Sequence, residues 1–101
     1  MAFVKVASLA SLPPGALIQA EVGEETYALC NAAGEIHALH GICPHAGGPI
    51  GQGALHGTTV VCPWHAWEYD CVTGQSDMAS DVCLAKFPVK IDGGDIFIDV
   101  P

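Results

Sequence analysis

The sequence contains two short motifs, Cys43-Pro44-His45-Ala46-Gly47-Gly48-Pro49 and Cys62-Pro63-Trp64-His65. They begin C-x-H and C-x-x-H, and residues 46–61 separate the first histidine from the second cysteine. Thiolates and imidazoles are common ligands of protein-bound metals. Two such pairs joined by one loop predict a metal site with four ligands, namely Cys43, His45, Cys62 and His65.

The order of the ligands helps to identify the metal. Structural zinc sites usually begin with two cysteines and end with two histidines. Here each motif holds one of each, which suits a binuclear centre in which each loop gives a cysteine to one iron and a histidine to the other. A Rieske 2Fe-2S centre has this ligation, with two histidines on one of its irons. A zinc-stabilised interaction module, colourless and redox-inert, is the alternative from another class.

Read together, the motifs closely resemble those of the Rieske family. The resemblance rests on the two motifs, on Ile50 after the first and on Tyr69-Asp70 after the second. It implies that Cys43 and Cys62 hold one iron of a single 2Fe-2S cluster, and that His45 and His65 hold the other near the surface. The implied fold is all-β, an antiparallel sandwich or barrel-like base carrying a small inserted two-loop cluster-binding subdomain.

Within the family, the sequence resembles the low-potential ferredoxins more than the cytochrome bc type. The bc-type proteins join the two loops by a disulfide, where this chain has Gly48 and Trp64. They also carry a serine that donates to a cluster sulfide, where this chain has Trp67. Fewer hydrogen bonds to cluster sulfurs give a lower potential. Tyr69 matches a bc-type tyrosine that donates to a cysteine sulfur, and we expect it to raise the potential modestly.

Gly47 and Gly48 have two interpretations. Glycines let the backbone approach the cluster sulfides closely and direct amides at them. They are equally common as plain turn residues. Trp64 and Trp67 flank His65, and we expect them to pack so that they shield the cluster.

The length of 101 residues indicates one domain, residues 1–101, with the cluster-binding subdomain at about residues 41–70. Twelve glycines and seven prolines are spread along the chain, and half of all residues are apolar. So many turn residues favour short strands in an all-β fold.

The charge is strongly negative. Eleven acidic residues accompany three lysines, for a formal net charge of −8. This balance argues against nucleic acids and anionic membranes as partners and favours basic protein surfaces. The acidity is equally explained as a means of keeping a small apolar-rich protein in solution.

The remaining features suit a cytoplasmic protein. We find no run of about 18 apolar residues that could span a membrane, and the valine-rich start ends at Pro13-Pro14-Gly15 like a strand and a turn rather than a leader. An odd number of cysteines, two of them ligands, indicates reduced thiols. The other cysteines, Cys30, Cys71 and Cys83, are expected to be small buried side chains. Three histidines, His37, His40 and His56, are expected not to be ligands.

Alternating apolar residues and turn signals predict the strands. They are Phe3–Val6, Ala16–Val22, Thr26–Cys30, Glu35–His40, Thr58–Val61, Trp67–Asp70, Lys86–Ile91 and a last strand containing Ile96, Ile98 and Val100. Turns are expected at Asn31-Ala32-Ala33-Gly34 and at Asp92-Gly93-Gly94-Asp95, the latter a strong hairpin signal.

The resemblance implies an electron carrier with no catalytic residue. It would pass single electrons from an NAD(P)H-dependent flavoprotein ferredoxin reductase to a terminal Rieske non-haem iron oxygenase that hydroxylates aromatic rings, and a monomer is expected. The nearest alternative is the small Rieske-like subunit of an NADH-dependent nitrite reductase. A complete oxygenase needs a further domain with a facial triad of two histidines and one carboxylate, for which 101 residues leave no room.

Overall fold

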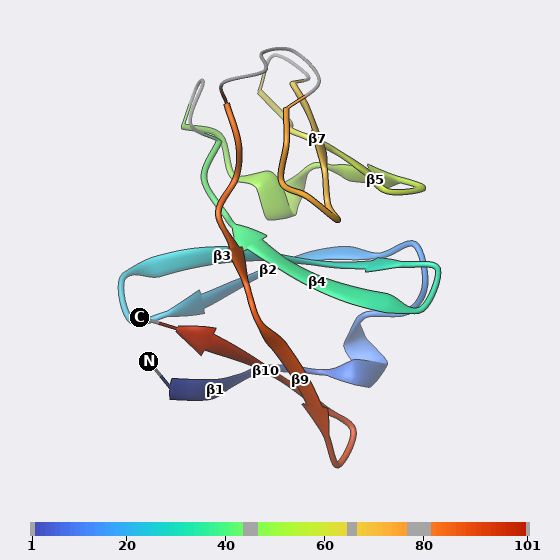
Figure 1. Cartoon of the computed structure of the whole chain (residues 1–101), viewed down its shortest axis with the longest axis vertical. Coiled ribbons are helices and arrows are strands. Elements are labelled where there is room, and N and C mark those ends of the chain that lie inside the picture. Colours follow the sequence, from blue (N-terminus) through green and yellow to red (C-terminus); the bar gives the residue numbers. More distant parts are fainter. Residues whose placement is uncertain (1, 44–46, 65–66, 77–81, 101) are drawn as a thin grey trace.

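The computed structural model describes residues 2–43, 47–64, 67–76 and 82–100, which form short strands in three sheets (Figure 1). The strands are β1 Ala2–Ser8, β2 Leu17–Val22, β3 Glu25–Ala32, β4 Glu35–His40, β5 Ala54–His56, β6 Thr59–Val61, β7 Glu68–Asp70, β8 Lys86–Phe87, β9 Val89–Asp92 and β10 Asp95–Val100. The helical elements among the described residues are two single 3₁₀ turns, Leu9–Ser11 and Ile50–Gln52. No helix in this part of the chain is long and apolar enough to cross a membrane. The predicted all-β fold is therefore confirmed.

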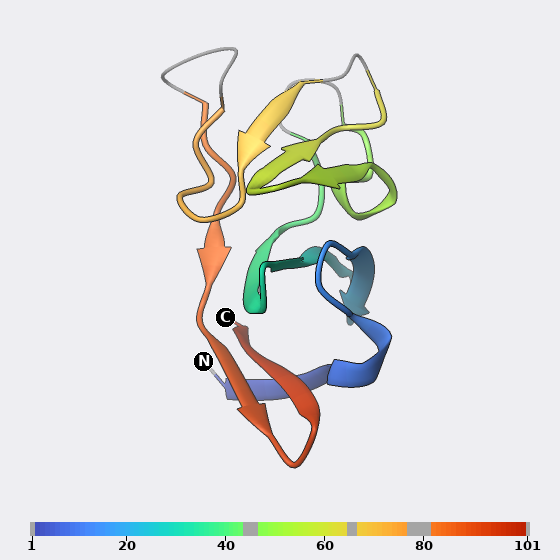
Figure 2. The ribbon, with the colours of Figure 1, turned by 90° about the vertical axis from the view of Figure 1, so that its right-hand side faces the viewer.

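All strand pairs are antiparallel. The sheets have the orders β1-β10-β9, β2-β3-β4-β8 and β5-β6-β7. Figure 2 shows the first two sheets forming a base near the chain ends, with the third sheet stacked at the opposite end of the molecule. The predicted insertion between two base strands thus has a small sheet of its own.

The central sheet, β2-β3-β4-β8, buries both of its faces, so its strands do not alternate between apolar and polar residues. Leu29 and Ala38 pack toward Ile96 and Ile98 of β10 in the base core. The other face of β3 and β4 forms a second core with the cluster-binding segment and its surroundings. From β3 and β4 this core contains Ala28, Cys30, Ala32 and Leu39, and from the rest of the chain it contains Cys43, Ile50, Val60, Cys62, Tyr69, Cys71 and Leu84. Burial on two faces explains the continuous apolar run in β3.

Two hairpin turns place consecutive residues at positive φ. Gly93 and Gly94 have φ of 60° and 80°, which confirms the predicted β9-β10 hairpin. The β3-β4 turn is shorter than predicted, because Asn31 and Ala32 belong to β3 and Ala33 and Gly34 alone form the loop. The Asn31 side chain explains the difference, since it donates to the Leu12 carbonyl and accepts from the Gly34 amide.

The predicted single strand Lys86–Ile91 is wrong, because it is two strands in two sheets. β8 pairs with β4 and β9 pairs with β10. Pro88 separates them, and proline has no N–H with which to continue a ladder. The chain therefore changes sheets at Pro88 and ties the two sheets of the base together.

The strand β5 was missed by the sequence interpretation. It forms a hairpin with β6 in which His56 pairs with Thr59, and Gly57 in the loop has φ of 64°. A three-residue strand is too short for alternation to reveal it. Gly57 was the available signal, because a glycine between two short apolar runs marks a hairpin.

Two glycines bring the cluster-binding segment close to the base. A Cβ on Gly41 would lie 2.7 Å from the backbone of Thr26, and one on Gly51 would lie 2.7 Å from Gln19 Cα. The Gly41 amide also donates to the Thr26 carbonyl over 2.8 Å. Any larger side chain at either position would separate the segment from the central sheet, so these contacts fix where the two loops stand.

Candidate metal centre

Each predicted ligand loop is closed by a backbone hydrogen bond from its own cysteine. The Cys43 amide donates to the Gly48 carbonyl, and the Cys62 amide donates to the Trp67 carbonyl, each over 2.8 Å. The first loop is also closed by a bridge between Ile42 and Pro49. The two cysteines therefore occupy equivalent places at the bases of two adjacent loops.

The two thiols lie side by side in the second core. Cys43 and Cys62 are each 1% exposed, both belong to the second core, and the Cys43 side chain acts on the Cys62 thiol. Burial raises the pKa of the Cys62 thiol; the Trp64 N–H, which donates to this sulfur over 3.4 Å, acts in the opposite direction, and Cys43 raises the pKa further. Two thiols from separate loops are thus held together in a water-poor site, where a cation would favour their thiolate forms.

Tyr69 contacts the first thiol. Its hydroxyl lies 3.0 Å from Cys43 Sγ, and the residue is fully buried. Burial raises the pKa of the Tyr69 hydroxyl, and the Cys43 contact acts in the same direction. The hydroxyl stays protonated at neutral pH, so it can donate to a Cys43 thiolate, as its match to the bc-type tyrosine predicted.

His45 and His65 lie outside the described residues, as does Pro44. The structure therefore places two of the four predicted ligands, and it brings those two together. In the described part of the chain, no group of three or more histidine, cysteine or acidic side chains could hold a metal ion. His45 and His65 stay predictions as the further ligands of a site that uses Cys43 and Cys62.

The described residues fit half of a binuclear iron-sulfur centre. Thiolates are soft ligands that suit iron and sulfide. A buried pair of them also has two donors close by, the Trp64 N–H and the Tyr69 hydroxyl, and such donors to ligand sulfurs tune iron-sulfur clusters.

The other cysteines are only partly as predicted. Cys30 and Cys71 are fully buried, which confirms the prediction for both. Cys83 is exposed, so the prediction of a buried side chain there is wrong. Cys83 makes an isolated bridge with Gln75, and its thiol faces the carbonyl oxygens of Thr73 and Leu84. Cys83 belongs to neither of the two cores that the described residues form.

His37 is a buried histidine, and both of its ring nitrogens lie close to polar side chains. Its Nε2 lies 3.1 Å from the Glu35 carboxylate, and its Nδ1 lies 3.4 Å from Lys86 Nζ. The same amine donates to the Val72 carbonyl in the loop after β7. Sequence analysis missed this link between base and loop, because no local pattern joins residues so far apart.

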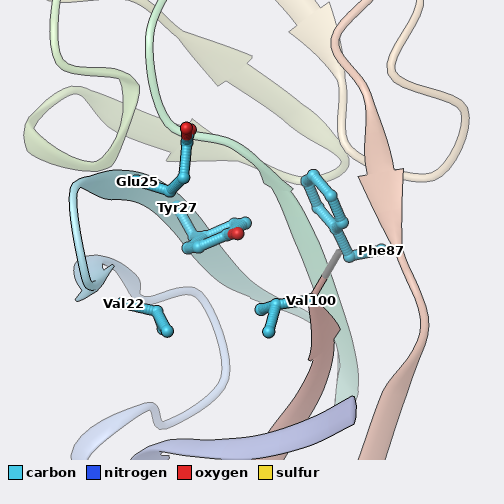
Figure 3. Close-up of a pocket in the computed structure, with 5 residues that line it drawn as sticks. All are labelled: Val22, Glu25, Tyr27, Phe87 and Val100. Atoms are coloured by element: carbon cyan, nitrogen blue, oxygen red, sulfur yellow. The ribbon is translucent and has the colours of Figure 1, made fainter. Parts of the chain in front are cut away.

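A pocket of about 360 Å³ lies in the base, where Val22, Tyr27, Phe87 and Val100 form its apolar walls (Figure 3). Glu25 adds a carboxylate at its edge. The Tyr27 and Phe87 rings meet edge to face, with centroids 4.9 Å apart. None of these residues belongs to the segment 41–70, so the pocket is separate from the candidate metal centre.

Comparison with known families decides the nature of the centre. The model of the Rieske 2Fe-2S domain matches residues 2–88 of the chain. The chain belongs to the Rieske family. Its cofactor is accordingly one Rieske-type 2Fe-2S cluster, and the structure's adjacent thiols suit this assignment.

The Rieske chain is similar over its whole length to known ferredoxins. It is 34% identical over 102 residues to the ferredoxin component of biphenyl 2,3-dioxygenase from Rhodococcus jostii, covering 99% of this chain and 94% of that protein. The ferredoxin of Sphingomonas yanoikuyae B1 superposes with a TM-score of 0.90 at 24% identity, over 99% of this chain and 100% of that one. A chain in the complex of reduced oxygenase and oxidized ferredoxin in carbazole 1,9a-dioxygenase gives 0.85 at 23%, over 95% and 91%. These structural likenesses show a shared fold.

Proposed function

We propose that this Rieske protein is a one-electron carrier, the ferredoxin component of an oxygenase system. It takes electrons from an NAD(P)H-dependent flavoprotein reductase and delivers them to a terminal Rieske non-haem iron oxygenase that hydroxylates aromatic rings. The observation that carries the proposal is the pair of buried thiols, Cys43 and Cys62, which two loops bring together in a chain that resembles oxygenase ferredoxins from end to end.

Cys43 and Cys62 hold one iron in this proposal, and His45 and His65 hold the other. Replacing two anionic thiolates by neutral imidazoles leaves less negative charge on the reduced centre and eases its reduction. When bound, the cluster supplies reversible storage of a single electron. The chain's own residues bury the cysteine sulfurs, direct two donors at them and exclude water.

The finer properties are also proposals. The whole chain acts as one domain, with a cluster-binding subdomain at about residues 41–70, which includes the sheet β5-β6-β7. It acts as a monomer in the cytoplasm. Five cysteines without a disulfide support a reducing compartment, and the net charge of −8 supports steering toward basic surfaces of redox partners.

The first experiment measures the centre directly. Iron, sulfide and zinc are assayed on the purified protein, and electron paramagnetic resonance (EPR) spectra are recorded before and after reduction with dithionite. The proposal expects two irons and two sulfides per chain and a rhombic signal of low average g on reduction. One zinc and no signal would instead indicate the structural module.

A second experiment tests the ligands one at a time. Serine replaces Cys43 or Cys62, and alanine replaces His45 or His65. Each variant should lose the Rieske signal. Cys83→Ser and His56→Ala, which change the same residue types outside the two motifs, should keep two irons and the signal. A variant of the four that retains the wild-type spectrum would remove that residue from the ligand set.

A third experiment tests the partners. The holoprotein is mixed with a ferredoxin reductase and a terminal oxygenase of an aromatic-ring dioxygenase system, and NADH-dependent product formation is measured with and without it. Product that depends on the holoprotein supports the proposal. Stable co-purification with a large sirohaem protein, and no turnover with the oxygenase, would support the nitrite reductase subunit instead.

A further inference from the structure

Two adjacent positions of the first loop are glycine for different structural reasons. Gly47 has φ of +76°, and nothing lies within 4 Å of the Cβ that a larger residue would place there. Gly48 is not among the glycines at positive φ. A Cβ at Gly48 would lie 2.9 Å from Cys62 Sγ and 2.9 Å from Trp64 Cγ. Gly47 therefore serves the turn, whereas Gly48 permits a close approach by the second loop.

The approaching atoms belong to the root of the Trp64 side chain and cannot swing away easily. A Cβ at Gly48 would also lie 3.0 Å from Trp64 Cβ, which moves only with the backbone. The Trp64 backbone is fixed in turn, because its N–H donates to Cys62 Sγ over 3.4 Å. Trp64 thus contacts the first loop with its side chain and the Cys62 sulfur with its backbone.

Burial of the indole does not account for this arrangement. Trp64 is 51% exposed, more than the other large apolar side chains of the described residues. A half-exposed tryptophan contributes less to a core than a buried one. Its contact with Gly48, by contrast, joins two loops that the hairpin β5-β6 separates in sequence.

We propose that Gly48 and Trp64 form a noncovalent clamp between the two ligand loops, and that Trp64 is a positioning residue for the 2Fe-2S centre. The clamp fixes the Cys62 sulfur relative to Cys43 and keeps the Trp64 N–H directed at that sulfur. The proposal rests on the proposed function, in which Cys62 is an iron ligand. Hydrogen bonds to the sulfurs and exposure to solvent both set the potential of an iron-sulfur centre, so the clamp controls the potential as well as retention of the cluster.

The test uses the holoprotein and four variants: Trp64→Phe, Trp64→Ala, Gly48→Ala and the double variant Gly48→Ala/Trp64→Ala. Two quantities are measured, the rate of iron release to a chelator and the midpoint potential from a redox titration followed by EPR. We expect release to be roughly tenfold faster in Trp64→Ala and Gly48→Ala, the size of effect typical of residues that orient metal ligands. Both variants should also shift the midpoint potential. Trp64→Phe, which keeps a ring against Gly48, should retain the wild-type rate of iron release and the wild-type potential.

The double variant tests the contact itself. Alanine at position 64 removes the contact with Trp64 Cγ but leaves the contacts with Cys62 Sγ and with the Cβ of residue 64. Gly48→Ala should therefore have a smaller effect in the Trp64→Ala background than in the wild type, so the two effects should not add. Val72→Ala and Gly47→Ala are the controls. Val72 is 42% exposed without being part of the clamp. Gly47 has open space for a Cβ but a φ of +76°, so its alanine variant measures backbone strain in the same loop without the contact to Trp64. Both controls should release iron more slowly than the clamp variants.

Two results would overturn the clamp. One is wild-type iron release and potential in Trp64→Ala, and the other is strictly additive effects in the double variant. If Gly48→Ala fails to fold by circular dichroism, the Trp64 series alone decides, because a half-exposed side chain can be shortened without loss of the core. A wild-type protein that lacks iron and sulfide would refute the proposed function, which is a different outcome from a loaded protein whose variants behave normally.

Discussion

The Tyr69 hydroxyl lies 3.0 Å from Cys43 Sγ, and both residues are almost completely inaccessible to water. A donor to a ligand sulfur stabilises the reduced, more negative state of an iron-sulfur centre. Tyr69→Phe removes the hydroxyl and keeps the ring, so the core packing is preserved. If the bond contributes about 1 kcal/mol more in the reduced state, the midpoint potential falls by roughly 40 mV. A redox titration checks this, and an unchanged potential would show that the hydroxyl does not tune the centre.

Gly41 is expected to be the most sensitive glycine at the junction with the base. Alanine there would place its Cβ 2.7 Å from the Thr26 backbone, so the hydrogen bond that joins the two residues must break or shift. We expect Gly41→Ala to lower the free energy of unfolding by about 3 kcal/mol. Gly57→Ala is the control, because Gly57 has φ of +64° and open space, and its strain should cost about 1 kcal/mol. Denaturant unfolding compares the two, and equal losses would argue against the close approach.

The buried thiol of Cys30 should make stability depend on alkaline pH. Burial raises its pKa above the ordinary 9.0, and the neighbouring Cys71 acts in the same direction. Above about pH 9 the unfolded chain loses this proton and the folded chain keeps it, so the free energy of unfolding falls by up to about 1.4 kcal/mol per pH unit.

Cys30→Ala should remove that contribution and leave a shallower slope between about pH 8 and about pH 10, whatever its effect on stability at neutral pH. Cys30 also lowers the burial-raised pKa of Cys71, so the difference between the two slopes reports the loss of Cys30 together with its effect on Cys71. Cys83→Ala, which removes an exposed cysteine, is the control. Identical slopes in wild type and Cys30→Ala would contradict the prediction.

Lys86 should stabilise the junction between β8 and the loop after β7. Its amine donates to the Val72 carbonyl and lies 3.4 Å from His37 Nδ1. Lys86→Met keeps the apolar stem and removes the donor, and we expect a loss of about 1 kcal/mol. Lys90→Met on the exposed strand β9 should change stability by less than about 0.5 kcal/mol. Thermal unfolding of both variants decides, and an unchanged midpoint for Lys86→Met would show that the contact contributes nothing.

Local patterns predicted most of the elements. The glycine pair 93–94 identified the last hairpin because consecutive positive φ angles are easy for glycine. The bounds of Glu35–His40 were correct as well. Errors arose where a strand is defined by the strand with which it pairs. Pro88 divides one alternating run between two sheets, and β5 is a strand only because β6 pairs with it. Cys83 is exposed and lies outside both cores of the described residues, which composition cannot reveal.

The sequence by itself determined the chemistry of this protein, because the order of cysteine and histidine in two motifs limits the metals that fit, and ligand type needs no knowledge of packing. The resemblance that these motifs carry was confirmed by the family to which the chain belongs. Only the tertiary structure distinguished Gly47, a turn residue, from Gly48, whose missing side chain leaves room for Trp64 and Cys62. The two glycines are adjacent and identical in sequence, and they differ only in what the second loop, folded against the same core, brings next to them.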